Sequence, residues 1–245
     1  MIFTRLLGKK AYFRGGKRII FIIMNIQDTS CTKRDMALQV ARELMGVGAV
    51  KLQPENPFTW ASGWHSPMYC DNRQALSYPA LRTLVKDGLC RLVRELYPEA
   101  EAVAGVATGA IAQGTLVADA LQLPFCYVRP KPKDHGMQNL IEGRVENGAK
   151  VVVVEDLIST GGSSLKAVQA LRDAGCEVLG MVASFTYGFP VAEKAFADAG
   201  VRLDTLSDYE AVLAEALRTG FVREEQLEVL RSWRESPDTW GKGAE

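Results

Sequence analysis

Residues 150–163 read Lys150-Val151-Val152-Val153-Val154-Glu155-Asp156-Leu157-Ile158-Ser159-Thr160-Gly161-Gly162-Ser163. This stretch predicts a strand, a turn and the start of a helix. Four consecutive valines predict a strand that is apolar on both faces, as a parallel strand between two layers of helices must be. Helical spacing follows from Ser163 to Ala174, and another apolar run, Val178 to Phe185, lies at the distance that a right-handed crossover needs. These elements predict a β-α-β unit in a parallel α/β sheet.

The end of the predicted strand combines two carboxylates with a loop of small residues. Ligands of open parallel sheets bind at the carboxyl ends of the strands. The residues from Thr160 to Ser163 offer hydroxyls, backbone N–H groups and the positive end of a helix dipole, which together suit a phosphate. Glu155 and Asp156 would repel a phosphate and are better suited to ribose hydroxyls, directly or through a hydrated Mg²⁺. The sequence therefore predicts a sugar-phosphate site.

This stretch allows two other interpretations. One is a buried strand followed by a surface acidic pair and an ordinary capped turn. The other is the second motif of a P-loop ATPase, but neither G-x-x-x-x-G-K-[ST] nor G-x-G-x-x-G occurs in the chain, which excludes the usual nucleotide folds. The segment resembles the phosphoribosyl pyrophosphate (PRPP) motif of type I phosphoribosyltransferases, and this resemblance favours the sugar-phosphate site.

Length and composition indicate a globular protein with one large α/β domain and a small appendage. The chain has 245 residues, of which 47% are hydrophobic and 24% are charged. The formal net charge of zero argues against a nucleic-acid partner bound through a broad basic surface. Five scattered cysteines without a C-x-x-C pair suggest neither a disulfide framework nor a zinc site, so we expect a reducing, cytoplasmic location.

Residues 1–24 differ from the rest of the chain in charge. They carry six basic residues and no acidic one, so the remainder has 23 basic against 29 acidic residues. The apolar run Ile19 to Met24 is too short to span a membrane or to form the core of a signal peptide. We expect residues 1–24 to be a disordered extension, with Met24 as the functional start and no membrane partner.

The remaining pattern divides the chain into an N-terminal helix and hood (residues 25–78), an α/β core (79–205) and C-terminal helices (206–245). Expected helices begin at Thr32 and after Pro79, and two more lie near 208–219 and 223–234. Expected strands of the core run from Ala102 to Ala107 and from Phe125 to Val128. Aromatic and turn residues between Val50 and Arg73 indicate a small β lobe, and Trp233 and Trp240 are available for packing.

A basic loop follows the second of these strands. Arg129, Lys131, Lys133 and His135 belong to a segment with two prolines and little to bury. Such a loop is often only a solvated surface. Cations brought over a departing pyrophosphate would, however, stabilise the charge that develops on it, and a histidine can change protonation near neutral pH.

Three stretches together resemble the orotate phosphoribosyltransferase family: Phe58 to Tyr69, Arg129 to Gly136, and Val151 to Ser163. The resemblance runs from about Thr32 to the C-terminus. It implies a type I phosphoribosyltransferase fold with a small N-terminal hood. It also implies transfer of the phosphoribosyl group of PRPP to orotate, giving orotidine 5′-monophosphate and pyrophosphate. Mg²⁺ would be held mainly through PRPP rather than by protein ligands, and the enzyme would be a homodimer whose mobile loop closes over the partner's site.

The resemblance also implies the roles of individual residues. Glu155 and Asp156 would hold the ribose hydroxyls, and Ser159 would lie at the ribose and the base. Tyr69 and Cys70 would line the orotate pocket with Ser159. The catalytic loop would supply Arg129, Lys131, Lys133 and His135, and Thr108 and Gly109 would form the pyrophosphate turn. The full set of implied PRPP contacts is Thr108, Gly109, Arg129, Lys133, His135, Glu155, Asp156, Leu157, Ile158, Ser159, Thr160, Gly161, Gly162 and Ser163.

Some positions depart from the family pattern. Ala61 and Thr108 stand where lysines are frequent, and Pro130 replaces a loop lysine beside Lys131. Phe185 to Phe189 contains no arginine for the orotate carboxylate. Two rival functions follow from the same fold: a purine-base phosphoribosyltransferase, which would need a different hood, and a PRPP-sensing regulator, which would need a DNA-binding module.

Overall fold

The computed structural model describes the chain except for residues 1–8, 15–16, 23–31, 61–62, 132–139 and 242–245. Its centre is a six-stranded sheet in the order β12-β11-β10-β7-β8-β9. All neighbouring strands pair in parallel except β8 and β9, which are antiparallel. The strands are β7 (Ala102–Val106), β8 (Phe125–Val128), β9 (Ile141–Glu142), β10 (Lys150–Ile158), β11 (Glu177–Thr186) and β12 (Leu203–Asp208).

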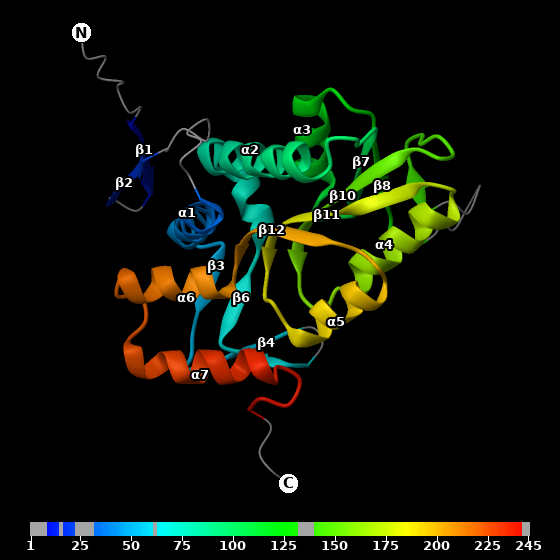
Figure 1. Cartoon of the computed structure of the whole chain (residues 1–245). Coiled ribbons are helices and arrows are strands. Elements are labelled where there is room, and N and C mark those ends of the chain that lie inside the picture. The colour runs from blue at the N-terminus through cyan, green and yellow to red at the C-terminus, as the bar shows by residue number, and fades with distance from the viewer. Residues whose placement is uncertain (1–8, 15–16, 23–31, 61–62, 132–139, 242–245) are drawn as a thin grey trace.

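Helices cover both faces of this sheet (Figure 1). One face carries α1 (Lys33–Gly46), α2 (Pro79–Leu96), α3 (Ile111–Leu121) and α6 (Tyr209–Arg218), and the other carries α4 (Gly162–Asp173) and α5 (Pro190–Asp198). The valines of β10 alternate between the two cores. Val152 and Val154 face the first core, and Val151 and Val153 face the second. The predicted doubly covered α/β sheet is confirmed.

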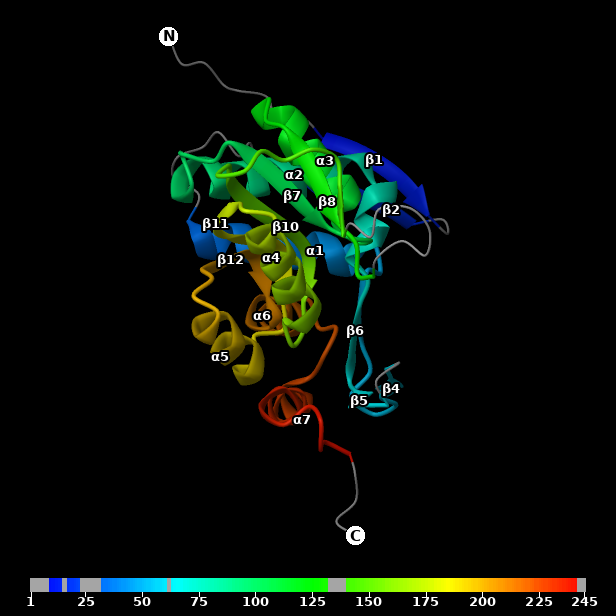
Figure 2. The ribbon, with the colours of Figure 1, turned by 90° about the vertical axis from the view of Figure 1, so that its right-hand side faces the viewer.

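The predicted hood is a pair of short antiparallel hairpins. Strand β3 (Val50–Leu52) pairs with β6 (Met68–Cys70), and β4 (Phe58–Thr59) pairs with β5 (His65–Ser66). Figure 2 shows these hairpins extending away from the sheet towards the C-terminal helix α7 (Glu224–Glu235). The hood is therefore held from two sides, by the sheet and by α7.

An aromatic cluster joins the hood to α7. The Trp233 ring is fully buried, and its centroid lies 5.7 Å from that of Trp60 in the hood and 5.6 Å from that of Tyr187, which follows β11. The Trp233 indole N–H donates a 3.0 Å hydrogen bond to the carbonyl of His65. Edge-to-face aromatic contacts of this kind add about 0.5–1.5 kcal/mol each to the burial of the rings. The expected packing of Trp233 is confirmed, and Trp240 is partly buried against the same core.

Several elements differ from the sequence-based expectation. Helix α5 and strand β12 were not predicted. In β12, which reads Leu203-Asp204-Thr205-Leu206-Ser207-Asp208, polar residues interrupt the apolar ones, so there is no strong apolar run. Buried Asp204 is tolerated there because Arg202 contacts it at 2.7 Å. Strand β9 was not predicted either. Strand β7 ends at Val106, one residue earlier than predicted.

The N-terminal segment contains a hairpin that the expectation of a disordered extension did not include. Strands β1 (Lys9–Arg14) and β2 (Lys17–Ile22) pair antiparallel with each other, as a sheet separate from the central one. The division of the chain into four segments remains a prediction.

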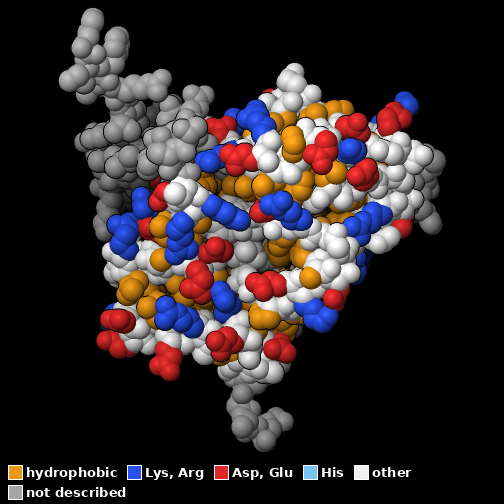
Figure 3. Space-filling model, in the orientation of Figure 1, with side chains coloured by type: hydrophobic (Ala, Val, Ile, Leu, Met, Phe, Trp, Pro, Cys, Tyr) orange, Lys and Arg blue, Asp and Glu red, His pale blue; other side chains and the backbone are white. Residues whose placement is uncertain are grey.

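Charge is mixed over the molecular face shown in Figure 3, where basic and acidic side chains are interspersed. In the part of the chain that the structure describes, no helix is both long and apolar enough to cross a membrane.

Candidate functional site

Glu155 and Asp156 lie at the carboxyl end of β10, as predicted, but in different environments. Glu155 is buried, and its two carboxylate oxygens accept hydrogen bonds of 2.9 Å from the Ser164 hydroxyl of α4 and from the Asp156 backbone N–H. Burial, and then the neighbouring Asp156 carboxylate, raise the pKa of Glu155 from 4.5 to about 9. Asp156 is only partly buried. The strand end thus presents one protonated, anchored carboxyl group beside one that is open to a ligand.

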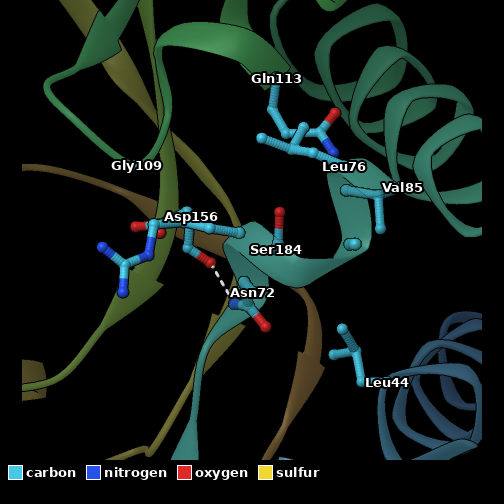
Figure 4. A pocket seen from close by; sticks show the side chains of 10 residues that line it. Leu44, Asn72, Leu76, Val85, Gly109, Gln113, Asp156 and Ser184 are labelled. Carbon is cyan, nitrogen blue, oxygen red and sulfur yellow. Dashed lines mark hydrogen bonds between the residues drawn. The ribbon is translucent and has the colours of Figure 1, made fainter. Parts of the chain in front are cut away.

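Asp156 is held from the opposite side of the sheet by the segment that follows the hood. The side-chain amide of Asn72 donates a 2.6 Å hydrogen bond to the Asp156 backbone carbonyl (Figure 4). The Cys70 thiol in turn donates to the Asn72 amide oxygen at 3.2 Å. Asn72 therefore links the predicted base pocket to the acidic pair across a sequence separation of 84 residues.

The turn between β7 and α3 approaches the Asp156 carboxylate very closely. A methyl group on Gly109 would overlap both oxygens of that carboxylate, so a Cβ there would force the Asp156 side chain to move. The peptide bond between Ala107 and Thr108 in the same turn is cis. Thr108 and Gly109, predicted as the pyrophosphate turn, are thus brought against the acidic pair.

The loop from Ser159 to Gly161 leads directly into α4, as predicted, although the helix begins at Gly162 rather than Ser163. Gly161 has a φ of +80° and packs on Phe196, where a side chain would collide with the ring. Gly161 also provides no side-chain cap for α4, and Thr160, Gly162 and Ser163 are exposed. The first N–H groups of a 12-residue helix are therefore open to an anion beside the acidic pair.

The remaining two residues of the PRPP motif, Leu157 and Ile158, belong to the central sheet and pack in its cores. Ile158 is fully buried in the second core, and Leu157 packs against the first. Both pair with β11, Leu157 opposite Phe185 and Ile158 opposite Thr186. Their expected contribution to PRPP binding is thus through the backbone rather than through their side chains.

Tyr69 and Cys70 lie on β6, at the underside of the hood. Tyr69 is 37% exposed, and its ring centroid lies 5.8 Å from that of Phe58. Burial, with the negative charges of Asp156 and Asp71 nearby, raises the pKa of the Cys70 thiol well above its ordinary value of 9.0. This thiol is a neutral packing and hydrogen-bonding group rather than a nucleophile.

Arg129 closes another side of the site. Its guanidinium lies 3.5 Å from Glu142, across the β8–β9 pair, and its backbone N–H donates to the Leu140 carbonyl at 2.8 Å. A cleft of about 540 Å³ runs from Arg129 and Ala107 to Gly162 and Ser163. Lys131 is exposed at the start of the loop. Lys133 and His135 lie outside the described residues, as does Ala61, so their roles remain predictions.

Sequence reasoning missed three residues that shape this site: Asn72, Arg73 and Ser164. The first two belong to the 3-10 helix η1 (Asn72–Ser77), whose polar sequence resembles an ordinary turn. Their signal was their position directly after the predicted base-pocket residues. Ser164 follows the predicted phosphate loop by one residue, but its hydroxyl is turned back to Glu155.

Comparisons with known proteins agree with this geometry. The phosphoribosyl transferase domain family matches residues 77–212. The chain is 65% identical over 203 residues to an orotate phosphoribosyltransferase of Bacteroides fragilis, covering 83% of this chain and 96% of that protein. Among solved structures, orotate phosphoribosyltransferase from Aeropyrum pernix is 31% identical with a TM-score of 0.66, over 75% of this chain and 99% of that one.

One of the similar solved structures contains PRPP. Orotate phosphoribosyltransferase of Mycobacterium tuberculosis bound to PRPP is 27% identical to the chain with a TM-score of 0.54, over 74% of this chain and 99% of that one. The domain match spans more than half of the chain, and the Bacteroides fragilis relative is matched over nearly its whole length. The chain therefore belongs to the phosphoribosyltransferase family and, within it, to the orotate phosphoribosyltransferases.

Proposed function

We propose that the protein is a cytoplasmic, Mg²⁺-dependent orotate phosphoribosyltransferase, which converts orotate and PRPP to orotidine 5′-monophosphate and pyrophosphate. The observation that supports this most is the position of the acidic pair. Glu155 and Asp156 lie between an open helix N-terminus and the hood segment that carries Tyr69 and Cys70. A sugar phosphate fits this order of groups, with its phosphate on α4, its hydroxyls on the carboxyl groups and its C1 below the hood.

The residues of the chain would act mainly by holding and orienting PRPP. N–H groups at the start of α4 bind the 5-phosphate, assisted by the helix dipole. Asp156 accepts hydrogen bonds from a ribose hydroxyl. Burial favours the protonated form of Glu155 in the ligand-free chain by raising its pKa, and its carboxyl group, anchored by Ser164, can share a hydrogen bond with a second ribose hydroxyl. This fixes C1 of the ribose for attack by N1 of orotate, as the bond from C1 to the pyrophosphate oxygen breaks and its electron pair leaves with pyrophosphate. The proton on N1 of orotate is lost in the same reaction and is taken up by the departing pyrophosphate or by water.

The carboxylate and the polyanionic substrate together suit Mg²⁺. This ion binds through one or two carboxylates and substrate phosphates, and retains several waters. Asp156 is the partly exposed carboxylate available for such a contact, directly or through water. Bound Mg²⁺ would neutralise part of the charge on the pyrophosphate group.

Substitution of Asp156 tests this assignment. Asp156→Asn preserves size and removes charge, and should weaken PRPP binding by about 1–3 kcal/mol, the cost of losing a charged hydrogen-bond partner. Asp173→Asn, at the opposite end of α4, serves as the control. Formation of orotidine 5′-monophosphate should be measured by chromatography at varied PRPP, with and without a Mg²⁺ chelator. Equal PRPP affinity in both variants would contradict the role of Asp156.

We further propose a homodimer in which the loop carrying Lys133 and His135 acts in the partner's site. This rests on the family resemblance and on the polar, proline-containing sequence of the loop. At a PRPP concentration at which Lys133→Ala and Asp156→Asn chains are each nearly inactive alone, a mixture of the two should then regain activity. A mixed dimer would have one site built from an intact Asp156 and the intact loop of the partner, while its second site would carry both changes.

Random exchange of equal amounts should restore about a quarter of wild-type activity, since half of the dimers are mixed and each has one intact site. If each loop serves its own chain, both sites of a mixed dimer carry one change and the mixture remains inactive. Subunit exchange must be verified by mass-labelled chains. Inactivity after verified exchange would contradict the shared site and leave the reaction assignment unaffected.

A further inference from the structure

Arg73 is an oriented cation that none of the predicted roles uses. It follows the hood strand β6, and its Nε–H donates a 2.7 Å hydrogen bond to Asp71. The Asp71 carboxylate also accepts from the Arg73 backbone N–H at 3.3 Å, and the Asp71 backbone is fixed by a 2.8 Å bond to the Ala49 carbonyl. Within the described residues, no hydrogen bond reaches the two terminal nitrogens of Arg73, and the side chain is 61% exposed. Arg73 thus presents a fixed, unsaturated pair of donors.

Arg73 borders the same water-sized cavity, of about 10 Å³, as Gly109 of the predicted pyrophosphate turn. The cavity is lined by Arg73, Asp156 and Gly109, together with Asn72, Gln113 and Ser184 (Figure 4 shows the labelled members). The ion pair with Asp71 raises the pKa of Arg73, and the charges of Tyr69 and Asp156 act in the same direction. The guanidinium is therefore positively charged, close to the acidic pair and close to the turn.

A cation beside this turn would stabilise a bound pyrophosphate group. Thr108 carries no charge, and two carboxyl groups lie beside a turn that would receive a departing polyanion. Arg129 is paired with Glu142 on the far side of the turn. Terminal guanidinium nitrogens can bind two phosphate oxygens at once, which the ammonium group of a lysine cannot do in the same geometry.

We propose that Arg73 binds the pyrophosphate group of PRPP through its two terminal nitrogens, supplying the charge that Thr108 lacks. The assignment rests on the proposed phosphoribosyl transfer. Asp71 is then a positioning residue that orients the guanidinium. The hood strand β6 and the residues that follow it would contact both the base and the leaving group. Tyr69 and Cys70 face the base, and Arg73 faces the leaving group.

The test compares Arg73→Ala and Arg73→Lys with Arg144→Ala. Arg144 is a matched control, because it too is exposed and bonds a carboxylate two residues away, Glu146, at 2.9 Å. Steady-state assays should give the KM for PRPP, the KM for orotate and the inhibition constant of added pyrophosphate. We expect Arg73→Ala to raise the PRPP KM and the pyrophosphate inhibition constant by about 10- to 150-fold, as for loss of hydrogen bonds to a charged group. The KM for orotate and the Arg144→Ala constants should change less than about twofold.

Arg73→Lys separates charge from geometry, and should recover only part of the pyrophosphate affinity. A rise in the orotate KM without a change in the pyrophosphate constant would assign Arg73 to the orotate carboxylate and overturn the proposal. Unchanged constants in both Arg73 variants would overturn it as well. If wild type transfers to a base other than orotate, the proposed function fails, but pyrophosphate inhibition with that base still tests Arg73. Should Arg73→Ala fail to fold, Arg73→Lys and Arg73→Gln provide the same comparison.

Discussion

Replacing Glu155 with glutamine should make the ligand-free protein more stable at alkaline pH while impairing its use of PRPP. Glutamine has the shape of a protonated glutamate. Its amide oxygen can accept from the Asp156 backbone N–H, and its NH2 group can donate to the Ser164 hydroxyl, which reverses the direction of that hydrogen bond. It removes a carboxyl group that burial and the adjacent Asp156 carboxylate force to retain its proton up to a pKa of about 9. The buried Glu155 carboxyl group therefore destabilises the wild-type protein at alkaline pH, and we attribute its presence to a role in PRPP binding.

The size of the effect follows from proton linkage. The pKa of Glu155 is raised from 4.5 in the unfolded chain to about 9 in the folded one. Between these values the unfolded state has lost the proton and the folded state has kept it, so the free energy of unfolding falls by about 1.4 kcal/mol per pH unit. At pH 8 this sets an upper limit of about 5 kcal/mol, and relaxation of the turn with water entry should make the measured difference smaller.

Urea unfolding of wild type and Glu155→Gln at pH 5, 6.5 and 8 measures this difference directly. The variant should gain on wild type as pH rises from 5 to 8. Glu215→Gln is the matched control. Burial acts to raise the pKa of Glu215, but hydrogen bonds from Arg42 and Arg218 outweigh it and lower the pKa. Glu215→Gln should lose about 1–2 kcal/mol at pH 8, because it weakens the charged hydrogen bonds that two half-exposed arginines donate to the buried Glu215 carboxylate. A Glu155→Gln variant that is destabilised, or whose difference from wild type is the same at every pH, would refute the reasoning.

Three further predictions concern other parts of the chain. Gly109→Ala should raise the KM for PRPP about tenfold or more by displacing the Asp156 carboxylate, whereas Gly46→Ala, where a methyl group meets nothing, should leave it unchanged. Trp233→Ala should lower the free energy of unfolding in urea by about 3–5 kcal/mol, with Trp233→Phe losing clearly less. A chain starting at Met24 should fold and retain full activity by circular dichroism and steady-state assay; lost solubility would contradict this.

Much of the central sheet could be predicted because its signals are local. The four valines of β10 are apolar on both sides, and the structure buries alternate valines in the two cores. The acidic pair and the small-residue loop that follow β10 also gave the end of the sheet at which the site lies. These features depend on neighbours in sequence, so a single chain is enough to find them.

Other parts depend on contacts between distant segments. Asn72 reaches the Asp156 carbonyl across 84 residues, and nothing in the sequence near Asn72 indicates that partner. Strand β12 is polar enough to resemble a loop, and pairing with β11 together with Arg202 contacting buried Asp204 makes it a strand. In the sequence, Gly109 looks like an ordinary turn glycine. Only the structure shows that a Cβ at this position would overlap the Asp156 carboxylate.

The central claim, transfer of a phosphoribosyl group to orotate, is tested most directly by a comparison of bases with the purified full chain. Loss of orotate absorbance with PRPP and Mg²⁺ should be measured beside parallel reactions with adenine, hypoxanthine and uracil, each scored by pyrophosphate release. The account predicts turnover with orotate, abolished by chelating Mg²⁺, and little or none with the other three bases. Turnover of a purine base without turnover of orotate would contradict it.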